Sequence, residues 1–336
     1  MGCSEAPSAK VAQASANRSK QLARTDHLPA NLAARMAQPP GAYKAGCGLG
    51  ILRPGRGAQV TPTVRGADDG AVRILTIDNP SKRNAFSGAM AATLLTELDR
   101  ADADPSVRAV VVTGAGGCFS SGHDLQEVLE HPDTAGDPVA NAAFSRPAEI
   151  LTPVIGAIDG PAYAAGFILA LNCDLRVATP AARFCAVGAA IGLVPVGGQL
   201  SRLLDLVGYP VAYRWLATAA PFDAAEAERH GFVTEVHDDA LGRAVEIART
   251  IASVSPSVVA AVKAGLNHSL RHGPDAGRAA EPRLAALVRE LPDGDEGVRA
   301  FLERRPPRYP DRPTDLNRRV VDALTGRQSS VEAGSN

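Results

Sequence analysis

The stretch GPAYAAGFILALNCDL, residues 160–175, joins a turn of small residues to a long apolar run. The segment before it, TPVIGAI (Thr152–Ile158), has the nearly uninterrupted apolar pattern of a strand that is buried on both faces. A strand that passes through such a turn into a helix leaves backbone N–H groups unpaired where the helix begins. These N–H groups, with the helix dipole behind them, suit an anion or a developing oxyanion. The stretch therefore predicts a backbone anion site at the mouth of a buried helix.

A second stretch, GAGGCFSSGHDLQEV (Gly114–Val128), repeats this design after the apolar strand RAVVVTG (Arg108–Gly114). Two converging N–H donors, one from each turn, would polarise a thioester carbonyl and stabilise its enolate. Glycine-rich turns between strands and helices are also common in α/β proteins for purely structural reasons. Both interpretations stay open on the turns alone.

Strand and helix signals alternate along the middle of the chain, which predicts an α/β fold with helices packed on sheets. Ser87 is a candidate N-cap for a helix that runs to Asp99, and Asp223 for a helix that stops at Gly231. From Ser255 onward the pattern is helical only. The other predicted elements are strands over AVRILTID (Ala71–Asp78), DLRVAT, ARFCAV and FVTEV (Phe232–Val236) and a short helix from Asp124.

Composition excludes several classes of function. The 336 residues carry a net charge of −1, so no overall field draws the chain to nucleic acid or to a membrane. Aromatic residues make up 4% of the chain, which argues against binding by base stacking. The five cysteines form no CxxC pair, which indicates neither a zinc site nor a disulfide framework and favours a reducing, intracellular compartment. The longest apolar stretch, 162–171, is too short to span a bilayer.

The two ends differ in composition from the middle. Residues 1–66 contain nine Lys and Arg but only two acidic residues, and they show no sustained periodicity. We interpret residues 1–65 as a disordered or targeting extension, because Arg-rich, acid-poor segments are typical of organellar transit peptides. This predicts a mitochondrial location, and a solvated tail on a cytoplasmic protein is the alternative. The Arg- and Pro-rich end, residues 308–336, is predicted to be disordered.

Several motifs together resemble the crotonase (enoyl-CoA hydratase/isomerase) superfamily. They are TIDNPSKRNAFSGAM, GCFSSGHDL, GPAYAAGFILALNCDL, IGLVPVGG, FDAAEAERHGFVTEV, the helix with Lys263 and Asn267, and EGVRAFLERRPP. The resemblance covers residues 66–307 and is greatest to the enoyl-CoA hydratase domain-containing protein 3 branch. It implies a spiral of ββα units over residues 66–254, a helical trimerisation region over residues 255–307, and a homotrimer or homohexamer.

The resemblance also implies a site. The backbone N–H groups of His123 and Ala165 would form an oxyanion hole, and the substrate would be an acyl-CoA thioester, with no metal and no cofactor besides this coenzyme A. The His123 imidazole would either pack or exchange protons, and Asp124 would serve as a helix cap. The coenzyme A path would be lined by Lys82, Arg83, Asn84 and Ala85, which could instead be a charged turn before a helix, and the loop Ser121, Gly122, Asp124 and Leu125 would complete the substrate-binding residues.

The sequence departs from the family where acid/base chemistry is expected. Family hydratases use two glutamates, and the matching positions here are Ile168 and Gly188. A third acidic position, used by dienoyl isomerases, falls on Val196. Each positioned acid or base is worth roughly 10²–10⁴ in rate, so ordinary hydration should be almost lost. The oxyanion donors are backbone groups and survive, although Ala165 adds a methyl group where glycine is more usual.

Three hypotheses remain for an acyl-CoA-handling protein of fatty-acid metabolism. The first is a weak hydratase or isomerase. The second is a decarboxylase of malonyl-type acyl-CoA, because GHD resembles the methylmalonyl-CoA decarboxylase branch, although the tyrosine of that branch is missing from Leu193–Val196. The third is a non-catalytic acyl-CoA-binding or regulatory protein. Cys118 and Cys185 have no neighbouring base in sequence and are expected to be core residues, and Gln199 and Ser201 either hold a water or begin a helix.

Overall fold

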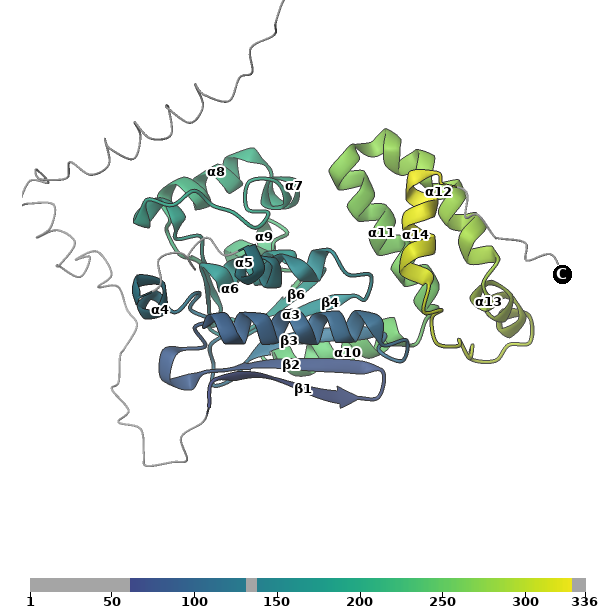
Figure 1. Ribbon diagram of the computed structural model, residues 1–336, viewed down its shortest axis with the longest axis horizontal. Coiled ribbons are helices and arrows are strands. Elements are labelled where there is room, and N and C mark those ends of the chain that lie inside the picture. Colours follow the sequence, from purple (N-terminus) through teal and green to yellow (C-terminus); the bar gives the residue numbers. More distant parts are fainter. Residues whose placement is uncertain (1–60, 131–137, 328–336) are drawn as a thin grey trace, which may run out of the picture. The chain divides into compact units, whose positions relative to one another are not determined.

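The computed structural model describes residues 61–130 and 138–327, and its centre is a six-stranded sheet in the order β1-β2-β3-β4-β6-β9 (Figure 1). Strand β1 is antiparallel to β2, and every other neighbouring pair is parallel. The strands are β1 (Thr63–Asp69), β2 (Val72–Asp78), β3 (Ala109–Gly114), β4 (Val154–Ile158), β6 (Leu175–Ala178) and β9 (Glu235–Val236). The carboxyl ends of β3 and β4 therefore lie side by side, and both turns of interest follow them.

A second, three-stranded sheet has the order β5-β7-β8. It consists of β5 (Pro161–Tyr163), β7 (Arg183–Cys185) and β8 (Phe222–Asp223). Strand β5 lies between β4 and helix α6 (Ala165–Asn172) in the chain, so three residues of the GPAYAAG turn form a strand of this sheet. The pairing of Tyr163 with Cys185 fixes where α6 begins.

Helices cover both faces of the large sheet. The side chains of β3 point alternately to these two faces, and each set packs against different helices. Val110 and Val112 belong to a core with α3 (Gly88–Ala103) and α6, whereas Ala109 and Val111 pack with α10 (Ala240–Ala252). Side chains of a strand point alternately to opposite faces, so a strand buried on both sides reads as a continuous apolar run. Figure 1 shows α3 and α10 on the two sides of the sheet.

The C-terminal third is helical and has its own small core. Helices α11 (Pro256–His272), α12 (Pro274–Arg289) and α14 (Leu316–Thr325) pack together, and α13 (Pro292–Leu302) adjoins them (Figure 1). Their shared core includes Ala260, Ala264, Leu284, Leu287, Leu316 and Val320. The remaining elements are α4 (Leu125–Glu130), α5 (Pro138–Ser145), α7 (Arg202–Val207), α8 (Tyr209–Thr218), α9 (Ala224–Arg229) and the 3₁₀ helices η1 (Pro80–Lys82), η3 (Arg146–Ala148) and η4 (Gly188–Ile191).

The helix caps expected from the sequence are confirmed. The Ser87 side chain accepts a hydrogen bond from the Met90 N–H, and the Asp223 carboxylate accepts one from the Glu226 N–H. The strand expected over residues 232–236 is shorter, because only Glu235 and Val236 pair with β6.

Both predicted ends need correction. The N-terminal extension was predicted to reach residue 65, but β1 begins at Thr63, where seven residues pair with β2 and Val64 enters the main core. The prediction of a disordered tail over residues 308–336 is wrong for Leu316–Thr325, because this segment is helix α14 and buries Leu316 and Val320 against the C-terminal core. Residues 1–60, to which the targeting interpretation applies, lie outside the described residues, so that interpretation stays a prediction.

Two further observations on the described residues concern membrane spans and metal sites. None of the described helices is by itself long and apolar enough to cross a bilayer; α10 and α11 meet that test only as a pair, with a bend of 109° between them. No group of three or more His, Cys, Asp and Glu side chains in the described part of the chain is arranged to hold a metal ion.

Candidate functional site

The two glycine-containing turns pack directly against each other. Ser120 pairs with Ala162 in a parallel bridge, since the Ser120 N–H donates to the Pro161 carbonyl and the Tyr163 N–H donates to the Ser120 carbonyl, both at 2.9 Å. A Cβ added to Gly166 would lie 2.6 Å from the Ser120 carbonyl oxygen, so no larger residue fits there without a shift. The structure therefore brings together the two segments that the sequence predicted to converge.

Gly122 makes the closest approach between the turns. Its φ of +106° is open to glycine, and an added Cβ would lie 2.7 Å from the Ala164 Cβ and 3.3 Å from the Ala165 N. Ala164 itself has φ +49° and ψ −115°, a strained conformation for a residue with a side chain. The absence of a Cβ at Gly122 leaves room for the Ala164 methyl group, and the strained turn directs the chain into α6.

The His123 and Ala165 N–H groups are the two predicted oxyanion donors. Strand-like bonds hold the chain around His123, because Phe86 donates to the Gly122 carbonyl and accepts from the Asp124 N–H, both at 2.8 Å. This pairing turns the His123 N–H away from Phe86. Ala165 is the first residue of α6, where a helix N–H has no partner within its own helix. Among the described residues, neither N–H has a protein acceptor.

Asn84 holds the first turn in place. Its side chain is fully buried, accepts from the Asn79 N–H and donates to the carbonyls of Ala115 and Cys118, and its own carbonyl accepts from the Ser120 hydroxyl. Of the four residues expected along the coenzyme A path, Asn84 and Ala85 are buried and Lys82 and Arg83 are exposed. The structure thus places the two cationic side chains at the surface and uses Asn84 to support the turn.

Ionic and polar contacts connect this charged segment to the His123 turn. Lys82 Nζ forms an ion pair with Asp124 Oδ2, and the Ser121 hydroxyl donates to the Lys82 carbonyl at 3.1 Å. The hydrogen bond from Lys82 lowers the pKa of Asp124 below its usual range. Asp124 also accepts from the Gln126 N–H at 3.2 Å, as a residue at the start of α4 does. Leu125 begins α4, and the prediction for its side chain falls outside the described residues.

The His123 side chain packs on an aromatic ring. Its imidazole lies edge-on to Phe144, with ring centroids 5.2 Å apart, and Phe86 contacts the same ring at 5.0 Å. Burial lowers the pKa of His123, an effect that Glu127 partly opposes. Burial thus favours the neutral form of the imidazole, and its packing on Phe144 fits the expectation that the side chain packs.

Neither position expected for a hydratase glutamate offers a carboxylate. Ile168 is buried in the first turn of α6, and its Cγ2 would lie 2.4 Å from a Cβ added to Gly197. Gly188 begins η4, where an added Cβ would lie 2.7 Å from the Leu193 carbonyl oxygen. A side chain at position 188 would therefore require the backbone of this loop to move.

The loop after Gly188 presents apolar side chains to solvent. Val196, the third expected acidic position, is exposed, and so are Ile191, Leu193 and Val194. Gln199 is buried and donates to the Val196 carbonyl at 2.9 Å, which tightens the loop. Ser201 is the N-cap residue of α7 without a side-chain cap bond. The described residues 188–199 of this loop thus supply backbone and apolar contacts and carry no acidic side chain, whereas Glu149 and Asp205 line the cavity beside Gly197 and Gly198.

The described cysteines are buried thiols. Burial raises the pKa of Cys118 and of Cys185 to about 11, so neither is a thiolate at neutral pH. Cys118 contacts the Arg83 carbonyl and Cys185 the Ala219 carbonyl, both at 3.2 Å. These contacts fit the expected role as core residues.

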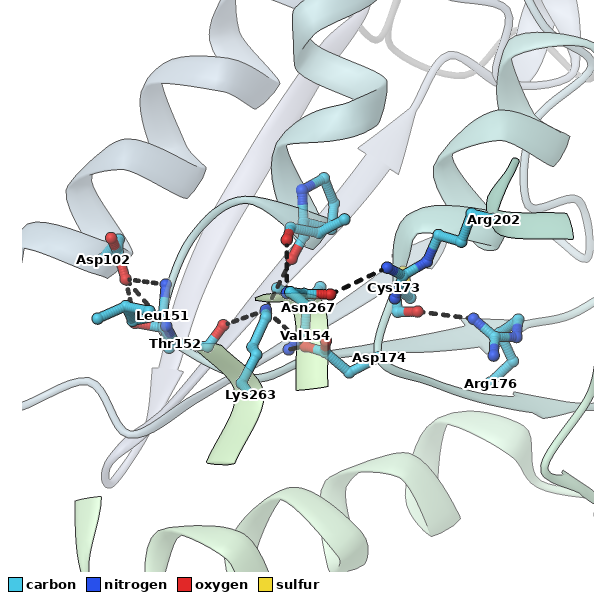
Figure 2. A network of polar contacts seen from close by, with 12 residues as sticks. Asp102, Leu151, Thr152, Val154, Cys173, Asp174, Arg176, Arg202, Lys263 and Asn267 are labelled. Carbon is cyan, nitrogen blue, oxygen red and sulfur yellow. Dashed lines mark hydrogen bonds and ion pairs between the residues drawn. The ribbon is translucent and has the colours of Figure 1, made fainter. Parts of the chain in front are cut away.

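A polar network lies beside the C-terminal end of α6 (Figure 2), and nothing in the sequence pattern predicts the part that Arg176 and Arg202 play in it. Lys263 Nζ donates to Asp174 Oδ2 at 2.6 Å and to the Pro147 and Thr152 carbonyls, while Asn267 donates to the Ala148 carbonyl. The resemblance had placed Lys263 and Asn267 in the family pattern without giving them a role. The side chains of Arg176 and Arg202 bind carbonyls at the end of α6. The only feature of the sequence that could have indicated these contacts is an arginine that follows closely after the end of an apolar helix.

Fold and site together define a class: an α/β protein in which two glycine-containing turns pack against each other at the carboxyl ends of parallel strands. The sequence profile described as enoyl-CoA hydratase/isomerase matches residues 68–312. The chain belongs to this family, and thus to the crotonase superfamily.

Relatives and solved structures agree with this assignment. The chain is 32% identical to enoyl-CoA hydratase EchA19 of Mycobacterium tuberculosis, an alignment that covers 72% of this chain and 94% of the relative. It is 33% identical to the 2,3-dehydroadipyl-CoA hydratase of Escherichia coli, over 72% and 96% of the two chains. The crystal structure of an enoyl-CoA hydratase from M. tuberculosis H37Rv superposes with a TM-score of 0.69 at 31% identity and covers 74% of this chain and 99% of that one.

Proposed function

We propose that this protein binds acyl-CoA thioesters and polarises their carbonyl with the N–H groups of His123 and Ala165, while hydrating enoyl thioesters far more slowly than hydratases with two carboxylates. One observation carries the proposal: the two N–H groups lie in turns that pack against each other and have no acceptor among the described residues, whereas positions 168 and 188 hold Ile168 and Gly188. Its family membership supports the substrate class.

The chemistry follows from what these residues can and cannot do. Two preorganised donors stabilise negative charge that develops on the thioester oxygen, and no charged side chain is needed for that effect. Hydration also requires a group that takes a proton from water and one that delivers it to carbon. Ile168 is aliphatic and Gly188 has no side chain, so the proton steps are left to solvent or to the substrate.

A second candidate is the base-free decarboxylation of a malonyl-type thioester, and the buried apolar Ile168 favours it. The bond between the α-carbon and the carboxylate breaks, carbon dioxide leaves, and the electron pair passes into the thioester enolate that the two N–H groups hold. A proton from water then completes the product. An apolar wall beside the carboxylate disfavours its charged form, and this cost is relieved as carbon dioxide leaves.

A binding and turnover experiment tests both candidates. The full-length protein is titrated with butyryl-CoA by calorimetry and incubated separately with crotonyl-CoA and methylmalonyl-CoA, with products followed by mass. We expect butyryl-CoA to bind and crotonyl-CoA to be hydrated slowly or not at all. Enzyme-dependent release of carbon dioxide would select the second candidate. Absence of thioester binding, or hydration as fast as a two-glutamate hydratase, would refute the proposal.

We further propose that the chain assembles as a homotrimer or a dimer of trimers. Helix α11 carries Val258, Val262, Leu266 and Leu270 at helical spacing, and all four are exposed. An exposed apolar stripe of this kind is typical of an interface between subunits. Light scattering after size-exclusion chromatography gives the mass directly, and a monomer at micromolar concentration would contradict the assembly.

A further inference from the structure

The two ends of α6 differ sharply in how their free backbone groups are treated. At the start, the Ala165 N–H has no acceptor among the described residues. At the end, the helix stops at Asn172, and the C-cap Cys173 is extended, so none of the usual left-handed glycine caps satisfies the last carbonyls. Arginine side chains do so instead.

Arg176 supplies the first of these caps. It is 3% exposed, and its Nη1 donates to the Ala170, Leu171 and Cys173 carbonyls at 3.2, 3.4 and 2.6 Å. Its Nε donates to the Phe232 carbonyl, and its guanidinium also lies over the Phe232 ring at 5.2 Å. Burial lowers the pKa of Arg176 to about 10, so the side chain is still a cation at neutral pH.

Arg202 supplies the second cap from a different element. Its Nε donates to the Leu171 carbonyl at 3.2 Å, and its Nη1 donates to Asn267 Oδ1 at 3.3 Å. Figure 2 shows Arg176 and Arg202 beside the Cys173 turn, with Asn267 holding Arg202 from α11. Arg202 also lines a cavity of about 390 Å³, so water can replace part of its side chain in a variant.

The acidic side chains near this helix end form no ion pair with either arginine among the described residues. Asp174 follows the helix, but its Oδ2 is shared by Lys263 Nζ at 2.6 Å and the Val154 N–H at 2.7 Å. Neither Arg176 nor Arg202 has an ion-pair partner among the described residues; Asp205 and Glu149 line the cavity without reaching Arg202. The two guanidinium groups therefore bind the last carbonyls of α6 directly, and the carboxylates of this region lie farther from those carbonyls than the guanidinium groups do.

We propose that Arg176 and Arg202 are positioning residues, which fix the end of α6 and keep positive charge behind it so that its first N–H polarises the thioester more strongly. The inference rests on the proposed function. Cations stabilise the carbonyl end of a helix, because that end carries partial negative charge. Since the helix has eight residues, its two ends lie about 12 Å apart, and each added positive charge also attracts the developing oxyanion over that distance.

The test compares a thioester with a ligand that lacks its carbonyl. Full-length protein is titrated with butyryl-CoA and with S-butyl-CoA, and the ratio of the two affinities reports carbonyl polarisation apart from coenzyme A binding. For Arg202→Gln, which keeps a hydrogen-bonding side chain without charge, we expect this ratio to fall about threefold. Coulomb's law across ~12 Å at an effective dielectric constant of ~20 gives about tenfold for a full negative charge and about threefold for the roughly half charge of a polarised carbonyl oxygen. S-butyl-CoA affinity should not change.

Matched variants separate charge from packing. Arg202→Lys keeps the charge and should keep the ratio, and Arg243→Gln, which breaks a surface ion pair with Glu235, should leave it unchanged. Arg202→Met serves as a second uncharged variant if the glutamine variant does not fold. An unchanged ratio in the uncharged variant, or an equal fall in Arg202→Lys, would overturn the proposal. A wild-type protein that binds both ligands equally would refute the proposed function and this inference together.

Discussion

The two sides of the candidate site are built in opposite ways. On the side of the oxyanion donors, two turns interlock through the paired Ser120 and Ala162 and through Gly122 and Gly166, where no Cβ fits. On the side where hydratases would hold carboxylates, Ile168 is buried, Gly188 lacks a side chain, and the loop from Ile191 to Val196 exposes apolar groups. Under the proposed function, activation of a carbonyl and transfer of a proton are therefore separable parts of one site, of which this chain retains only the first.

The largest expected loss of activity comes from a substitution that separates the two turns. Gly122→Ala would place a Cβ 2.7 Å from the Ala164 Cβ in a left-handed conformation, so the turns must separate. Loss of one oxyanion donor lowers turnover by roughly 10²–10³, and we expect at least the lower figure for any reaction found. The preference for butyryl-CoA over S-butyl-CoA should also disappear.

Gly116→Ala is the matched control, because Gly116 lies in the same loop with φ +70° and has nothing within 4 Å of an added Cβ. Its substitution carries the left-handed strain without the collision. Equal loss of thioester preference in both variants would show that loop strain, and not the approach of the turns, controls the donors.

The opposite side can be tested by restoring a carboxylate. Ile168→Glu should raise the hydration of crotonyl-CoA by about 10²-fold over wild type, the lower end of what a positioned acid or base supplies. Ile168→Gln, which has the same shape without the charge, should not. Gly188→Glu should give no increase, because its Cβ meets the Leu193 carbonyl oxygen. Equal rates for the Glu and Gln variants at position 168 would contradict the assignment of this position.

A smaller effect is expected at the mouth of the site. Asp124→Asn removes the ion pair with Lys82, whose side chain is 45% exposed. Exposed pairs contribute about 0–1 kcal/mol, so coenzyme A affinity should change by less than about fivefold. Calorimetry at two salt concentrations measures it. A far larger loss of affinity would mean that Asp124 does more than hold Lys82 and begin α4.

The smallest effect concerns the His123 imidazole, whose pKa burial lowers. The unfolded chain takes up this proton near the ordinary pKa of about 6.5, before the folded protein does. The contribution of His123 is thus complete above that pH and is lost as the pH falls toward the lowered value. Urea unfolding between pH 7.5 and 5 should show a smaller decline for His123→Gln than for wild type. Parallel declines would show that His123 is not responsible.

Local sequence patterns predicted the two turns on the side of the oxyanion donors. The strand–turn–helix pattern identified both turns, and the caps at Ser87 and Asp223 follow rules that operate within four residues. The sequence did not predict β1 or α14, because their stability depends on pairing and packing partners and not on their own pattern.

The polar contacts at the C-terminal end of α6 could not be predicted from the sequence for the same reason. Arg202 and Asn267 are 65 residues apart, and Lys263 and Asp174 are 89 apart. The requirement for glycine at position 188 depends on the path of a loop that returns five residues later. Such contacts are set by the tertiary structure, so residue spacing alone could not reveal them.

The most direct test of the central claim is the infrared spectrum of butyryl-CoA labelled with ¹³C at its carbonyl and bound to the full-length protein. Two N–H donors at the oxygen should move the carbonyl band to lower frequency than in free butyryl-CoA, and Gly122→Ala should abolish this displacement. A bound thioester whose carbonyl band stays at its solution frequency would contradict the account, because the His123 and Ala165 N–H groups would then not form an oxyanion hole.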